Sequence, residues 1–181
     1  MTYAANKLVL QADDAGIGGA TIMEGDGVKN FDAQLGSSRN FSDFDVVTVM
    51  FGVNDYMNSK HTLDEVKVKL TGQLTTLKSK VAHGKIYGIL PLQSYRTPLP
   101  TFWSKLSAQT TRNAYGYSMN EMMDMEKSVF ESLDIPVLDW RNHEFVTDSN
   151  YDYWLPNDAL HPGQKGYIRM GQVITNFIKD N

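Results

Sequence analysis

With 181 residues, of which 41% are hydrophobic and 21% charged, and a formal net charge of −4, the chain has the composition of one soluble globular domain. It carries no basic run and no apolar stretch of membrane-spanning length, which argues against a nucleic-acid partner, a transmembrane helix and a signal peptide at its start. It also lacks cysteine, which excludes disulfides, thiolate metal sites and a cysteine nucleophile, and favours a secreted or cell-surface protein.

Three short apolar runs predict buried parallel strands. Residues 45–51 (DVVTVMF), 85–90 (KIYGIL) and 135–140 (IPVLDW) are rich in hydrophobic and β-branched residues. That composition is typical of strands covered on both faces. Longer helical patterns separate the runs, and this alternation predicts an α/β fold with a parallel sheet.

Three amphipathic helices are predicted between and after these strands. The first covers about residues 62–81, with a capping box of Thr62 and Glu65 at its start and Gly84 just past its end. The second starts near Ser118 with the same pattern, and the third is expected to carry Pro162 in its first turn. The Met-rich part of the second helix is expected to be core packing. The apolar face predicted for the third comprises Tyr167, Met170, Val173, Ile174, Phe177 and Ile178.

Two long irregular stretches, residues 93–117 and 142–157, are expected near the carboxyl ends of the strands, where open parallel sheets bind ligands. Long loops in compact α/β domains are often functional. We therefore predict that Trp103, Tyr151 and Trp154 contact the substrate. The competing interpretation is that these rings pack in the core and at its rim.

The stretch 156–167 (PNDALHPGQKGY) places Asp158 three residues before His161, at the entry to the last helix. A carboxylate one turn away can orient an imidazole and stabilise its protonated form. The pair therefore fits a general base with its carboxylate partner, and an incidental helix-entry pair is the alternative.

Two other turns fit an acyl-transfer site. Asn54 lies in FGVNDY (51–56), directly after the first predicted strand, where its amide can donate to a developing oxyanion. Its neighbour Asp55 is expected to hold the turn, and a plain Asn-Asp turn is the alternative. The glycine-rich stretch AGIGGATI (15–22) fits neither a dinucleotide-binding nor a phosphate-binding loop. A backbone N–H of that turn can serve the same oxyanion.

In this order and spacing the three motifs resemble the SGNH hydrolases, also called the GDSL esterase/lipase family. GIGGATI looks like the family's second block, with Gly19 as the oxyanion-hole glycine. FGVND looks like the third block, with Asn54 as its asparagine. DALHP looks like the fifth block, which supplies the triad Asp158 and His161.

The resemblance runs from the first residues to the C-terminus, and it implies a flavodoxin-like three-layer α/β/α sandwich with a five-stranded parallel sheet. It also implies a serine nucleophile, ester substrates and no cofactor or metal. The sequence agrees in having no HExxH or His-x-His pattern. A metal site of His161 with Asp13 or Asp14 is the alternative.

The family's first block, Gly-Asp-Ser, is missing upstream of Gly19, because none of residues 1–18 is serine. We expect residues 1–181 to form a single domain that is incomplete at its N-terminal side, in which residues 3–19 look like the family's first helix running into its second strand. A second chain, a swapped segment or a rearranged N-terminus would then complete the sheet. A rival alignment places Asp14 where the serine belongs.

The predicted function is hydrolysis of short-chain or sugar-acetyl esters by a serine esterase whose nucleophile is not in this chain. The alternative is a non-catalytic carbohydrate-binding module derived from an esterase, on a cell surface or a virus particle. It would bind glycans through the aromatic residues of the two loops. A Gly-Asp-Ser block upstream in the gene would favour the enzyme.

Overall fold

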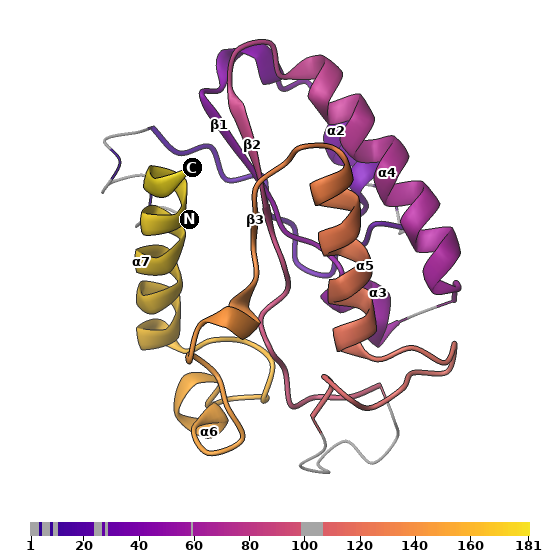
Figure 1. The fold of residues 1–181 in the computed structure, drawn as a ribbon, viewed down its shortest axis with the longest axis vertical. Helices are drawn as coiled ribbons and strands as arrows, with labels where there is room; N and C mark the ends of the chain where they lie inside the picture. Colours follow the sequence, from indigo (N-terminus) through magenta and orange to yellow (C-terminus); the bar gives the residue numbers. More distant parts are fainter. Residues whose placement is uncertain are drawn as a thin grey trace.

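The computed structural model describes residues 4, 8, 11–23, 27, 29–58, 60–98 and 107–181. Its sheet has three parallel strands in the order β1-β2-β3 (Figure 1). The strands are β1 (Val46–Val49), β2 (Lys85–Ile89) and β3 (Val137–Leu138). They lie inside the three predicted runs, so the predicted α/β fold with a parallel sheet is confirmed. Each strand is shorter than its run, which extends beyond the paired residues at one end or both.

Side chains of β2 alternate between the two faces of the sheet. Tyr87 meets Phe177 of the last helix edge to face, with ring centroids 5.7 Å apart. Gly88 faces the other way, and a Cβ there would lie 2.7 Å from the ring of Phe130. Glycine is therefore required for the aromatic ring to close onto the strand.

Helices cover both faces of the sheet (Figure 1). On one face lie α4 (Leu63–Lys80) and α5 (Met119–Ser132), and on the other lies α7 (Gln164–Asp180). Each face has its own buried apolar cluster, and the Met-rich segment of α5 lies inside the first of them, as predicted. The shorter helices are α2 (Phe31–Leu35), η1 (Phe41–Asp43), α3 (Val53–Met57), η2 (Trp140–Asn142) and α6 (Tyr151–Trp154).

The predicted helix starts are confirmed for α4 and α5, which begin with complete capping boxes at Thr62 and Ser118. Gly84 has a different role from the predicted one, since Val81 is the C-cap of α4. A Cβ on Gly84 would lie 2.1 Å from the backbone oxygen of Phe44, so this glycine permits a close backbone approach.

Two expectations for the last helix are corrected. Pro162 precedes the helix, because Gly163 is the N-cap and the first helical residue is Gln164. Tyr167 does not share the buried face, since it is 55% exposed, whereas Met170 and Val173 are buried. The tyrosine lies in the first turn of α7, beside Ile168, which is also exposed.

The strand predicted near the N-terminus is not formed in the described residues. Leu8 is helical and Gln11–Ile17 have no regular structure. Thr21 instead forms an isolated parallel bridge with Asn30, at the start of α2. Within the described part of the chain, β1 pairs with β2 and with no other strand. None of the described helices is both long and apolar enough to cross a membrane.

Candidate active site

The three sequence motifs lie at the carboxyl end of the sheet. Gly52 and α3 follow β1, the loop after β2 starts at Leu90, and η2 and α6 follow β3 (Figure 1). Because all three strands run in the same direction, the segments that follow them gather at one edge. The motifs therefore lie at the edge of the sheet where the sequence places them.

Asp158 and His161 form the first half of the site. His161 Nδ1 lies 2.5 Å from Asp158 Oδ2. The other carboxylate oxygen, Oδ1, accepts the backbone N–H groups of His161 (2.8 Å) and Leu160 (3.1 Å). The carboxylate thus fixes both the ring and the turn that carries it, while the His161 side chain remains 65% exposed.

Hydrogen bonds keep Asp158 ionised. Partial burial works to raise its pKa, but the backbone and side-chain hydrogen bonds from His161 and the N–H of Leu160 outweigh it, so the pKa lies below its usual value. Arg96 Nη1 adds a positive charge 3.7 Å from Oδ2. An ionised carboxylate on Nδ1 holds the imidazole in the tautomer whose Nε2 can accept a proton.

The loop after β2 holds the turn between these two residues. Ala159 adopts a φ of 56°, an unfavourable conformation for a non-glycine residue. Its carbonyl accepts the backbone N–H of Tyr95 at 2.9 Å and the hydroxyl of buried Ser94 at 3.4 Å. The loop after β2 therefore supports the Asp158–His161 turn through the carbonyl of Ala159.

Gly19 and Asn54 form the second half. Ala20 N–H donates to the carbonyl of Ile17 at 3.1 Å, which closes a turn in which Gly19 has a φ of 82°. Such a turn needs glycine at this position. Its own hydrogen bond uses the N–H of Ala20 rather than that of Gly19, and Gly19 is exposed.

Asn54 connects this turn to the sheet. It lies in the first turn of α3, after Gly52 with its φ of 100°. Asn54 Nδ2 donates to the carbonyl of Ala20 at 2.9 Å. An amide nitrogen carries two hydrogens, so one remains for another acceptor. The hydrogen bond places the amide directly beside the glycine turn.

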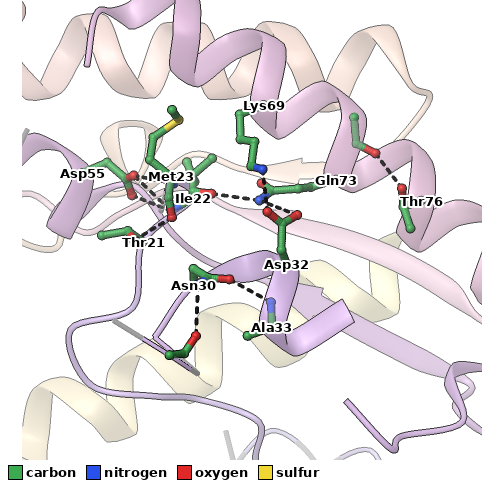
Figure 2. Close-up of polar contacts among 12 residues, drawn as sticks. Thr21, Ile22, Met23, Asn30, Asp32, Ala33, Asp55, Lys69, Gln73 and Thr76 are labelled. Carbon is green, nitrogen blue, oxygen red and sulfur yellow. Dashed lines mark hydrogen bonds and ion pairs between the residues drawn. The ribbon is translucent and has the colours of Figure 1, made fainter. Parts of the chain in front are cut away.

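Asp55 and Gln73 hold the segment that follows the glycine turn (Figure 2). Asp55, only 4% exposed, accepts the N–H of Ile22 at 2.9 Å and that of Met23 at 3.0 Å. Gln73 Nε2 donates to the carbonyl of Ile22 at 2.8 Å and to Asp32 at 3.1 Å. Side chains from α3 and α4 thus hold both the N–H and the carbonyl of Ile22, which supports the expectation that Asp55 holds the turn.

Two buried polar residues of this region escaped the sequence analysis, Gln73 and Glu126. Both lie on the apolar faces of their helices, three residues after Leu70 and four after Met122, respectively. A polar residue at a core-facing position of an amphipathic helix is the signal that could have revealed them.

The predicted substrate-contacting rings contribute mostly to packing. Tyr151 stacks on Tyr95 with centroids 4.2 Å apart, and Trp154 meets Phe145 at 4.8 Å. Both are partly buried. Trp103 lies outside the described residues. The competing interpretation of rim packing therefore fits Tyr151 and Trp154 better.

The alternative metal site lacks support in the described residues. Asp13 pairs with Arg39 at 2.8 Å, and Asp14 accepts the N–H of Gly16 at 2.9 Å. The described part of the chain contains no group of three His, Asp or Glu residues placed to hold a metal ion.

Comparison with known proteins supplies the context. The sequence model of the GDSL-like Lipase/Acylhydrolase family matches residues 2–169. A protein from Lactobacillus plantarum has a similar structure, with a TM-score of 0.78 and 19% identity over 98% of this chain and 85% of its own. A carbohydrate acetylesterase family member from Sinorhizobium meliloti has a TM-score of 0.71 and 14% identity over 98% and 84% of the two chains. A lipase/acylhydrolase from Enterococcus faecalis has a TM-score of 0.66 and 19% identity over 99% of this chain and 84% of its own.

At sequence identities this low, the three similar structures show a shared fold and nothing about activity. A search of curated proteins finds no match to the sequence.

Proposed function

Since this chain belongs to the GDSL-like lipase/acylhydrolase family and is an esterase-type enzyme, we propose that it hydrolyses short-chain or sugar-acetyl esters with a serine nucleophile. His161 is the general base, Asp158 orients it, and Gly19 and Asn54 stabilise the oxyanion. The observation that carries the proposal is the 2.5 Å contact between His161 Nδ1 and Asp158 Oδ2, at the edge of the sheet where Asn54 also lies.

The reaction proceeds through an acyl-enzyme. The serine Oγ attacks the ester carbon while His161 Nε2 takes its proton, and the Gly19 N–H and the second hydrogen of Asn54 Nδ2 donate to the carbonyl oxygen as it becomes negative. The ester C–O bond then breaks, and the imidazolium returns the proton to the departing alcohol. Water, deprotonated by the same histidine, releases the acid and regenerates the serine.

We place the nucleophile on a segment outside residues 1–181. Ser94 lies beside the Asp158–His161 turn, but it is buried and its hydroxyl is bonded to the backbone of Arg96 and Ala159. Its role is therefore structural. Residues 1–181 form one domain, and a second chain or a swapped segment pairs with the side of β1 that faces away from β2.

The substrate class rests on the loops around the dyad. Tyr153, 55% exposed, carries Lys165 over its ring, with Nζ 5.1 Å from the centroid. A polar, aromatic rim suits an acetylated sugar better than a long acyl chain. The carbohydrate acetylesterase family member among the similar structures supports the same choice.

The proposal is tested by the rate of ester cleavage in the full gene product. We expect hydrolysis of p-nitrophenyl acetate and of acetylated xylo-oligosaccharides, and little hydrolysis of p-nitrophenyl palmitate. Cleavage of the palmitate ester at a comparable kcat/KM would contradict the substrate class. Absence of cleavage, with binding of deacetylated glycans retained, would favour the non-catalytic binding module.

A further inference from the structure

Glu126 is a buried acid that the proposed mechanism does not use. It projects from the middle of α5 and is only 2% exposed. Burial of a carboxyl group among the methionines of α5 is costly. The cost requires a compensating role, and the surroundings of Glu126 indicate which role that is.

The Glu126 carboxyl lies directly against the backbone of Gly52. A Cβ on Gly52 would be 2.2 Å from Oε1, 2.9 Å from Cδ and 3.1 Å from Oε2. The whole carboxyl group therefore occupies the space that any other side chain at position 52 would fill. Gly52 is also the N-cap of α3, with a φ of 100°, so this contact lies at the bend that aims α3.

A continuous series of contacts leads from Glu126 to the oxyanion donors. Gly52 is two residues before Asn54, whose amide holds the carbonyl of Ala20 at 2.9 Å. Asp55, the residue that holds Ile22 and Met23, also acts electrostatically on Glu126. The first path reaches the glycine turn at Ala20, and the second reaches Ile22 in the segment that follows that turn.

We propose that Glu126 is a positioning residue for the oxyanion site, which holds the Gly52 bend and thereby sets the place of the Asn54 amide relative to Gly19. This inference rests on the proposed function of Asn54. Glu126 is a positioning residue and not a catalytic one, because its side chain is buried.

The charges of the two buried acids fit this role. Burial and the nearby Asp55 raise the pKa of Glu126 well above its usual value. Burial also raises the pKa of Asp55, although the N–H groups of Ile22 and Met23, which its oxygens accept, work to lower it. A raised pKa favours the protonated form of Glu126, so glutamine, which has the same size and no charge, is its matched substitute.

The test compares Glu126→Ala with Glu126→Gln, with Glu131→Gln as a control at an exposed position of the same helix. Two quantities are measured: kcat and KM for p-nitrophenyl acetate, and the chemical shifts of the Asn54 side-chain amide, assigned by their loss in Asn54→Ala. We expect Glu126→Ala to lower kcat roughly ten- to a hundredfold with KM nearly unchanged, because a small misplacement of a donor is costly. The amide resonances should shift in Glu126→Ala and stay in place in the glutamine variant and the control.

Unchanged kcat and unchanged Asn54 resonances in a folded Glu126→Ala protein would overturn the inference. If that variant does not fold, Glu126→Asp replaces it, since it withdraws the acid from Gly52 by one methylene and should move both readouts in the same direction. A wild-type protein without esterase activity, whose Asn54 resonances nevertheless shift in the variant, would refute the proposed function and leave the positioning role standing.

Discussion

The two halves of the site are built in opposite ways. Asp158 and His161 are three residues apart and lie in an exposed turn. The oxyanion half joins Ala20 to Asn54 across 34 positions, and Ile22 to Asp55 across 33. A local pair costs little chain entropy to close, whereas the distant pairs form only when the whole domain folds. Changes in the first half should therefore affect mainly chemistry, and changes in the second both chemistry and stability.

The largest expected effect is a loss of kcat on changing the exposed pair Asp158–His161. Replacing His161 with alanine removes the general base and should lower kcat by about 10³-fold, in the middle of the range for acid–base catalysis. The free energy of unfolding should change little, because the ring is mostly exposed. The measurement is hydrolysis of p-nitrophenyl acetate, with His83→Ala as the control. A comparable loss in the control variant would contradict the assignment.

The next largest effect is expected in the oxyanion half of the site. Asn54→Ala removes one oxyanion donor and should lower kcat by roughly 10²-fold, as for other single donors of this kind. It also leaves the Ala20 carbonyl without its 2.9 Å partner, so the melting temperature should fall too. Asn58→Ala, at the exposed end of the same helix, is the matched control. A fall in melting temperature with an intact kcat would show that Asn54 is purely structural.

The free energy of unfolding should distinguish Asp55 from Asp158 most clearly. Asp55→Ala removes the acceptor of the buried Ile22 N–H and of the partly buried Met23 N–H, and should lower the free energy of unfolding by about 2–3 kcal/mol. Asp158→Ala breaks an exposed pair and should cost about 1 kcal/mol or less. Urea unfolding of both variants measures the difference. Equal losses would contradict the division between a buried and an exposed half.

The smallest expected effect is the pH dependence of the stability that Asp158 contributes. Its pKa is lower in the folded protein than in the unfolded chain. Its ionised form therefore contributes stability that is fully present above the unfolded pKa of about 3.9 and is lost as the pH falls through the folded pKa. Asp158→Asn should be less stable than the wild type at neutral pH, and the gap should close in acid. A gap that stays constant down to pH 2 would exclude this contribution.

The sequence was sufficient for the locally encoded parts. The capping boxes at Thr62 and Ser118 and the Asp158–His161 turn depend on residues three positions apart, so their patterns are readable without a fold. The order of the motifs along alternating strands and helices was also enough to predict the edge of the sheet where the site lies.

The parts that escaped prediction depend on distant neighbours. The packing of Glu126 on Gly52 and the hydrogen bond of Gln73 to Ile22 are visible only in the folded chain. The strand expected within residues 3–19 falls partly outside the described residues, and Gln11–Ile17 have no regular structure. The ring contacts of Tyr151 with Tyr95 and of Trp154 with Phe145 are likewise set by the fold, and substrate contact by these two residues stays a prediction.

The central claim is that a serine outside residues 1–181 works with His161. Fluorophosphonate labelling of the full gene product, purified from cells and analysed by intact mass of every polypeptide, tests it most directly. The account predicts an adduct on a segment outside this sequence, lost in the His161→Ala variant. An adduct on a serine within residues 1–181, or no adduct on any polypeptide, would contradict it.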